Sequence, residues 1–309
     1  MAGEAQGLYP LYTTQFTTAF ELKLQQMGSK LRSKVGEGFH VGKMASPINQ
    51  IGAIQSKSPA GRYAPKNRTD ADFTRRWVFP QDKEIDQLID SFDELKTIAD
   101  PKSHYVQNAA NAAGRDWDDA ILAAATGTAQ TGQDAAGLSA ETFDTAKFQV
   151  LSTFSASAAT GLTVAKLIEA RRIFRHYHND LDSDPMTIVI GSQQESDLLK
   201  QSQVVNVDYN DRPVLVDGKV TRFVGFDIVV LERVPESTVG SVRGCIAFVK
   251  SGLYLGMWQE TTNRVSIRND LSSEPFDLYS KWSYGATRTQ PGKVVQVLCA
   301  DTTGADITP

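Results

Sequence analysis

The residues best suited to chemistry are few in this chain, which contains four histidines and two cysteines. His176 and His178 alternate, so in an extended segment both imidazoles could bind one metal ion. No cysteine or third histidine lies near them, and they end a predicted helix. We therefore interpret the pair as a solvated helix terminus and expect no metal site.

A second candidate is the acidic group Asp116, Asp118 and Asp119. On a helix the first and last of these share a face, and paired carboxylates can perform acid–base chemistry or bind a divalent ion. Arg115 stands beside them, and a mixture of charges is typical of the solvated side of an amphipathic helix. We expect the charged side of a helix here.

Other signs of catalysis are missing from the sequence. Cys245 and Cys299 lie inside apolar runs without a partner at ligand spacing, which predicts buried, reduced thiols. Asp217-Gly218 between β-type residues is typical of a tight hairpin turn. The chain has no phosphate-binding loop, nucleophile elbow, HExxH or CxxC motif. We predict no catalytic residue, cofactor or resident metal.

The bulk composition limits the classes of partner that the chain is expected to bind. The 309 residues carry a formal net charge of −4, and their basic residues are scattered, so strong nucleic-acid binding is not expected. No apolar run reaches the length of about 18 residues that crosses a bilayer, and the N-terminus lacks the pattern of a secretory signal. We expect a soluble protein, made inside the cell, without a membrane partner.

Two segments at the start of the chain have little with which to build a core. Phe16, Phe20, Leu24, Met27 and Leu31 recur every three or four residues and predict a short amphipathic helix in an arm over 1–35. Residues 36–80 are rich in glycine and proline, with short β-type pieces at 39–41 and 77–79. This predicts a long extended hairpin or loop that projects from the body and contacts something else.

The remaining sequence alternates helical and strand patterns. A helix is expected over 82–98, then a long spine helix over about 101–127, started by Asp100-Pro101 and roughly 39 Å long, and then a surface loop over 127–160. Thr163 predicts the cap of a helix, 186–190 a strand, and Ser192 to Glu195 a capping box. Strands are expected at 214–216, 223–231, 245–250, 254–258, 264–267, 280–289 and 294–298. The fold class is α+β.

The chain resembles the major capsid proteins of tailed bacteriophages, both in short stretches of sequence and in the order of its parts. The first matching strings are Tyr12-Thr-Thr-Gln-Phe16, Leu24-Gln-Gln-Met-Gly-Ser-Lys-Leu-Arg32 and His40-Val-Gly-Lys43. In the middle come Ile98-Ala-Asp-Pro-Lys-Ser-His-Tyr105, Ala113-Gly-Arg-Asp-Trp-Asp-Asp119 and Ala123-Ala-Ala-Thr-Gly127. The last are Tyr284-Gly-Ala-Thr-Arg288 and Val294-Val-Gln-Val297. Their number and order carry the resemblance, which covers nearly the whole chain.

The resemblance implies a Hong Kong 97-type capsid fold. Its parts would be an N-terminal arm (1–35), an extended loop lying across a neighbouring subunit (36–80) and a peripheral domain with the spine helix (81–160). An axial domain (161–260) and C-terminal strands returning to the peripheral domain (261–309) would follow. The implied function is self-assembly into hexamers and pentamers of an icosahedral shell around double-stranded DNA. An encapsulin-like compartment or another virion protein is the alternative.

The implied partners are further copies of the chain, a portal protein at one vertex and packaged DNA bound without specificity. Because the arm begins within the first few residues, we expect a separate scaffolding protein. The resemblance leaves room for a decoration protein, and it implies assembly in the bacterial cytoplasm and residence in the virion capsid. As inter-subunit contacts we predict the arm anchors Phe16, Phe20 and Leu24 and the loop cations Arg62, Arg68, Arg75 and Arg76, because apolar anchors and arginines dominate interface energetics.

Overall fold

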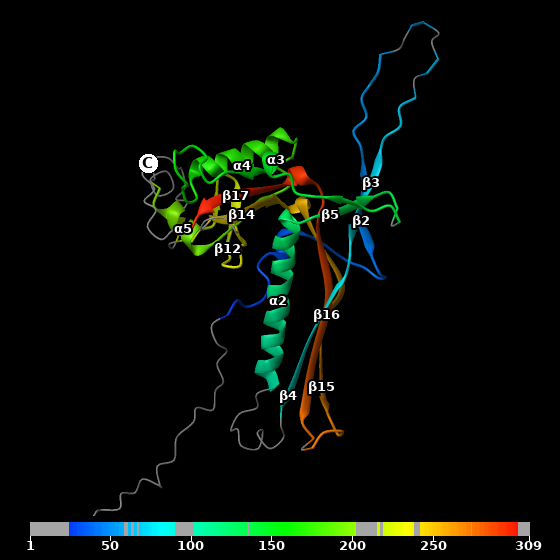
Figure 1. The fold of residues 1–309 in the computed structure, drawn as a ribbon, viewed down its shortest axis with the longest axis vertical. Coiled ribbons are helices and arrows are strands. Elements are labelled where there is room, and N and C mark those ends of the chain that lie inside the picture. The colour runs from blue at the N-terminus through cyan, green and yellow to red at the C-terminus, as the bar shows by residue number, and fades with distance from the viewer. Residues whose placement is uncertain are drawn as a thin grey trace, which may run out of the picture.

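The computed structural model describes residues 25–58, 61–62, 65–66, 68–89, 102–134, 136–201, 215–216, 219–237, 242–272 and 274–301. These residues form an elongated molecule of three parts (Figure 1). A mixed α/β lobe is joined to a helix and a long narrow sheet that run away from it together. A thin hairpin leaves the body beside the lobe and points in the direction opposite to that sheet.

The lobe is built on one mixed sheet in the order β11-β12-β8-β14-β17-β7, with β13 pairing β14 beside it. Strands β12 and β8 are parallel, whereas β14 is antiparallel to β8 and to β17. Its strands are β7 (Gln149–Val150), β8 (Met186–Ile190), β11 (Arg222–Phe223), β12 (Phe226–Val230), β13 (Glu236–Ser237), β14 (Val242–Val249) and β17 (Val294–Ala300). The lobe also contains α3 (Thr145–Phe148), α4 (Val164–His176), α5 (Ser192–Leu199), the two-stranded ladder of β9 (Leu215–Val216) and β10 (Lys219–Val220), and the 3₁₀ turns η4 (Lys250–Gly252) and η5 (Pro291–Lys293).

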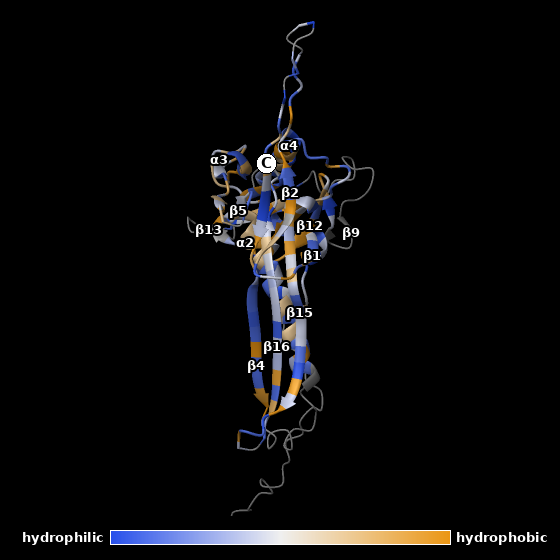
Figure 2. Cartoon of the chain, turned by 90° about the vertical axis from the view of Figure 1, so that its right-hand side faces the viewer, coloured by the Kyte–Doolittle hydropathy of each residue, from blue (hydrophilic) through white to orange (hydrophobic). Residues whose placement is uncertain are grey.

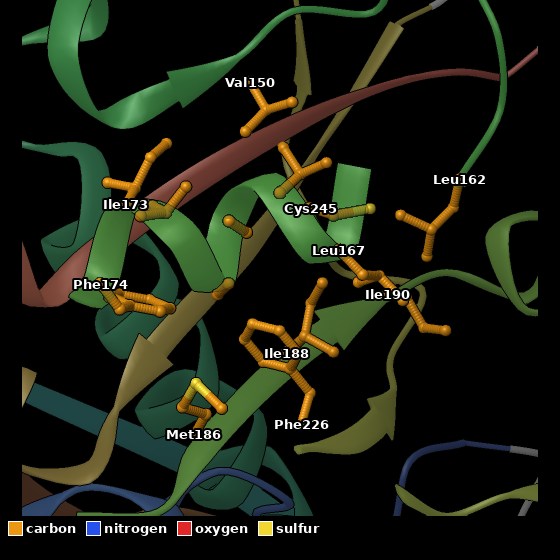
Figure 3. Close-up of a cluster of buried hydrophobic side chains, with 14 of the residues drawn as sticks. Val150, Leu162, Leu167, Ile173, Phe174, Met186, Ile188, Ile190, Phe226 and Cys245 are labelled. Carbon is orange, nitrogen blue, oxygen red and sulfur yellow. The ribbon is translucent and has the colours of Figure 1, made fainter. Parts of the chain in front are cut away.

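Helix α4 covers this sheet, and Figure 3 shows the core between them. Phe174 of α4 packs near Phe226 of β12, with ring centroids 6.2 Å apart. All five residues of β8 are buried, which explains its uninterrupted apolar sequence. Lys166 is also fully buried, and its Nζ donates hydrogen bonds to the carbonyls of Thr160, Gly161 and Leu298. Burial lowers the pKa of Lys166, while these three acceptors stabilise its charged form.

The second part pairs the long helix α2 (Lys102–Thr126) with a four-stranded sheet in the order β1-β15-β16-β4. Its strands are β1 (Gly36–Phe39), β4 (Gln81–Ile89), β15 (Leu253–Ile267) and β16 (Phe276–Arg288), and the 3₁₀ turn η2 (Arg32–Lys34) precedes β1. Ile121 and Leu122 of α2 share a core with Trp282 and Tyr284 of β16. Arg288 then ties the end of the helix to the sheet, because its guanidinium donates to the carbonyls of Ala125 and Gly127.

The projecting part is the hairpin of β2 (Ala45–Ile51) and β3 (Phe73–Val78), extended at its base by β5 (Ala129–Gly132) and β6 (Ser139–Glu141). Gln50 anchors it by donating to the carbonyl of Thr289 at 2.8 Å. Trp77 Nε1 donates to the carbonyl of Gly132 at 3.2 Å. The base of the hairpin is therefore fixed to the body, while its distal residues extend beyond it (Figure 1).

Several sequence predictions are confirmed. The spine helix is α2, and the side chain of Thr163 caps α4 by accepting from the backbone N–H of Lys166. The strand at 186–190 has the predicted limits. Val216 pairs with Lys219, which is the register of a two-residue hairpin turn. Cys245 and Cys299 are buried and not bonded to each other.

Other predictions are wrong. Residues 82–89 of the expected helix over 82–98 belong to strand β4, because they pair with β16, and the later ones lie outside the described residues. The described part of the expected arm helix, 25–31, is not helical. The expected surface loop at 127–160 contains β5, β6, α3 and β7, and the two strands expected at 254–258 and 264–267 are one strand, β15. Helix α5 is capped at Gly191, whose N–H is accepted by the side chain of Gln194, rather than at Ser192.

Candidate assembly surfaces

The first candidate surface is the point where the N-terminal arm leaves the body. Asp118 of α2 is fully buried there and receives four hydrogen bonds from the chain preceding β1. Oδ1 accepts from the hydroxyl of Ser29 at 2.5 Å and the N–H of Leu31 at 3.1 Å. Oδ2 accepts from Gln26 Nε2 at 2.5 Å and the N–H of Lys30 at 3.0 Å. A buried carboxylate needs such partners, so Asp118 holds this segment in one place.

Neighbouring residues of α2 complete the attachment, which we call the arm root (residues 25–31). The N–H of Gly28 donates to Asn111 Oδ1 at 3.2 Å, and Arg115 donates to Gln25 Oε1 at 2.7 Å. Gly114 allows the close approach, because a Cβ there would lie 2.5 Å from the carbonyl carbon of Gly28. The arm root is therefore held in a defined position on α2 by hydrogen bonds and by close backbone packing.

The expectation of a solvated acidic face is wrong for Asp118. Asp119 does fit it, since it is half-exposed and forms an ion pair with Arg233. Asp116 is partly buried, which raises its pKa. A signal for Asp118 was present in the sequence, because spacings of three or four residues place it on the buried side of the helix. The residues of that stripe are Asn111, Gly114, Asp118, Ile121 and Ala125.

The predicted arm anchors Phe16, Phe20 and Leu24 lie outside the described residues, and their role stays a prediction. Leu31, which ends the same apolar stripe, is fully buried in the core between α2 and the long sheet. The stripe therefore includes at least one residue that packs inside its own subunit.

The second candidate surface is the projecting hairpin, and the structure separates the four predicted arginines. Arg62 and Arg75 are exposed, and Arg68 is exposed with an ion pair to Asp70 at 2.9 Å. Arg76 is only 5% exposed and forms an ion pair with Glu141 of β6. The difference follows from strand geometry, because Arg75 and Arg76 point to opposite faces of β3. An inter-subunit role remains a prediction for all four, and the geometry favours it for the three exposed ones.

Exposed apolar side chains on the same part of the molecule were not predicted from the sequence. Ile51, Ile54 and Phe73 on the hairpin are all more than half exposed, and Val41 before it is 97% exposed. Figure 2 shows the orange hydrophobic segments along the hairpin. Exposed apolar groups gathered on a projecting element are typical of an interaction surface.

Metal-holding clusters and membrane-spanning helices are both absent from the described part of the chain. Those residues contain no group of three or more histidine, cysteine, aspartate or glutamate side chains placed to hold a metal ion, at His176 and His178 or elsewhere. Among the described helices, none is long and apolar enough to cross a membrane.

Comparison with known proteins identifies the family to which the chain belongs. Residues 9–301 match the model of a family described as phage capsid protein. No curated protein sequence matches the chain. Among solved structures, the capsid of cyanophage P-SCSP1u is similar, with a TM-score of 0.74, 15% identity and 96% of each chain covered. The capsid of cyanophage Pam1 gives 0.72 at 12% identity, covering 97% of this chain and 99% of the other. That of Helicobacter pylori bacteriophage KHP30 gives 0.67 at 12%, covering 96% and 97%.

Proposed function

Since this chain belongs to the phage capsid protein family and is a major capsid protein that forms the shell, we propose that its copies assemble as hexamers and pentamers around double-stranded DNA. Its α+β structure has the Hong Kong 97-type capsid fold. The family match over nearly the whole chain carries the proposal, and it favours a capsid over an encapsulin-like compartment. The proposed role is structural, without a catalytic step.

The two candidate surfaces supply the proposed mechanism. The arm root holds residues 25–31 at one defined point beside α2, and the hairpin carries exposed apolar and cationic side chains away from the body. Each contact of this kind is weak, but a closed shell repeats it many times, so the total affinity is large. Phe16, Phe20, Leu24, Arg62, Arg68 and Arg75 are the proposed contact residues.

The proposed domain organisation follows the same logic. The arm spans 1–35 and the extended loop 36–80. The peripheral domain contains α2 and the long sheet, and the lobe of β8, β14 and α4 is the axial domain.

In the proposed assembly pathway, which runs in the host cytoplasm, a separate scaffolding protein guides shell closure and a portal occupies one vertex. Packaged DNA then meets a wall of small net negative charge, −4 per chain, without specific contacts. A decoration protein on the outside is compatible with this organisation.

The test is removal of residues 1–24, which leaves the partners of Asp118 in place. We expect a folded body, shown by unchanged circular dichroism and thermal unfolding, that forms no closed shells by electron microscopy. The matched control is the full chain with Phe16, Phe20 and Leu24 replaced by serine, which separates apolar anchoring from mere arm length. Normal shells from both variants would overturn the proposed role of the arm.

A further inference from the structure

We propose that His40 is a pH-sensitive attachment point of the projecting hairpin, which holds the start of the hairpin on the long sheet while its imidazole is neutral and releases it on protonation. The segment concerned is residues 40–44, which we call the hairpin foot and which joins β1 of the long sheet to β2 of the hairpin. The inference goes beyond the proposed function, because the release takes place within a single copy of the chain.

Backbone contacts on both sides of a turn hold the hairpin foot against β15. Pairing of β1 with β15 runs up to Phe39, and the N–H of His40 adds one more hydrogen bond, to the carbonyl of Met257 at 2.8 Å. The chain then turns at Gly42, whose φ of +103° lies in the left-handed region that favours glycine. Trp258 Nε1 donates to the carbonyl of Gly42 at 2.7 Å. The foot therefore leaves the long sheet at a defined point.

The imidazole of His40 lies between two aromatic side chains of β15. Its Nε2 is 2.8 Å from the hydroxyl oxygen of Tyr254, and its ring centroid is 5.4 Å from that of Trp258. Two glycines keep this space open. A Cβ at Gly38 would overlap the Tyr254 hydroxyl, and one at Gly256 would lie 3.1 Å from the His40 ring. Because Trp258 contacts this ring and also binds the foot, the position of the imidazole and that of the foot are linked.

Protonation of His40 disrupts this arrangement. With its hydrogen on Nδ1, the neutral imidazole accepts through Nε2 from the hydroxyl of Tyr254, and this is the hydroxyl's one hydrogen bond among the described residues. The imidazolium is a donor at both nitrogens, so the hydroxyl loses its acceptor and a half-buried site receives a positive charge. The rings of His40 and Trp258 are tilted by 51°, which is not a stacked arrangement, so cation–π attraction offsets little of this cost.

The charged groups nearby do not compensate for the positive charge. Tyr254 is the titratable side chain that faces His40 from β15, and burial, together with the charge of Glu37, raises its pKa, so it stays neutral. Glu37 points to the opposite face of β1, where it pairs with Arg32 in a groove that Lys250 of η4 also lines. Lys43 of the foot itself is exposed. Among the described residues, no carboxylate pairs with His40.

The direction of the pH effect follows from the burial of the imidazole. Burial lowers the pKa of His40 from its ordinary value of 6.5. Because the folded-state pKa is lowered, the attachment is intact above pH 6.5 and is lost as the pH falls below that value. Release of the foot leaves the hairpin joined to the body through β3 and through the bond from Gln50 to Thr289. The direction in which the hairpin projects therefore depends on pH.

Hydrogen exchange of the full-length chain before assembly tests the attachment. Exchange is measured at pH 7.5 and pH 5.5, and each rate is corrected for the intrinsic pH dependence of amide exchange. We expect the N–H groups of the hairpin foot to lose protection at pH 5.5, while those of the buried strand β8 keep it. His40→Gln cannot take up a proton and should show the same protection of the foot at both pH values. The matched control, His176→Gln at an exposed histidine, should behave like the unmodified chain.

A titration of the His40 imidazole by nuclear magnetic resonance gives a second measurement on the unmodified chain. We expect its midpoint below 6.5, and Tyr254→Phe, which removes the hydroxyl donor, should raise that midpoint. Equal protection of the foot at both pH values, an equal loss in His40→Gln, or a midpoint at or above 6.5 would overturn the inference. None of these readouts requires a shell, so a chain that never closes shells would contradict the proposed function and leave this inference standing.

Discussion

Asp118 illustrates how much a single side chain contributes to the arm root. Its two oxygens accept four hydrogen bonds from residues 26–31, two of them from backbone N–H groups. A carboxylate can only accept, which suits this cluster of donors. Within the acidic group on α2, Asp118 is therefore the member that positions the chain preceding β1.

Asp118→Asn tests this assignment. The amide keeps the shape of the side chain but places an NH₂ group against donors, so we expect the unfolding free energy to fall by about 1–3 kcal/mol. Hydrogen exchange at the N–H groups of Lys30 and Leu31 should accelerate. Asp119→Asn is the matched control, and loss of its half-exposed ion pair should cost less than about 1 kcal/mol without changing that exchange. Unchanged exchange in the Asp118 variant would contradict the arm root described above.

Glu232 predicts a pH dependence. It accepts from the hydroxyl and N–H of Ser192 at the start of α5 and from Arg243, which lowers its pKa to about 2 from 4.5. Because the folded-state pKa is depressed, its stabilisation is present above pH 4.5 and is lost as pH falls toward 2. Most of the side chain is solvated, so the effect should stay below about 1 kcal/mol. Between pH 6 and pH 3, Glu232→Gln should lose less unfolding free energy than the unmodified chain in denaturant titrations, and equal losses would contradict the assignment.

At the scale of elements, signals carried by a few neighbouring residues were enough to predict several helices and the projecting hairpin. The spine helix has an alanine-rich stripe and a start signal, α4 has a threonine cap, and the glycine- and proline-rich segment indicated the projecting hairpin. Strand β4 shows where this fails. Ile85, Leu88 and Ile89 fit a helical period, while Asp82, Glu84 and Asp86 fit a strand, and pairing with β16 nearly 200 residues later decides between them.

The candidate site shows the same difference between signals from neighbouring residues and contacts made far along the chain. Arginine type and loop position were enough to select Arg62, Arg68 and Arg75, which are exposed, but not to separate them from the buried Arg76. Asp118 was missed because its partners lie 87 to 92 residues away in the chain. The strands β5, β6 and β7 were missed for a similar reason, since β5 is held by β3 and β7 by β17.

At the scale of the whole molecule, the residues that form the two cores are distinct from the proposed contact residues of the hairpin. Two buried cores stabilise the lobe and the spine, and neither includes the distal hairpin. The hairpin and the far end of the long sheet lie at opposite ends of the long axis (Figure 1). Residues 45–78 carry a net charge of +4, whereas the rest of the chain carries −8. Under the proposed function, association of identical copies covers the exposed apolar side chains of the hairpin at each repeat of the contact.

The most direct test of this account is electron microscopy of the purified full-length chain, alone and co-expressed with a scaffolding protein. The account predicts closed icosahedral particles, or rings of five and six subunits where closure is incomplete. A monodisperse monomer or small oligomer under every condition would contradict it.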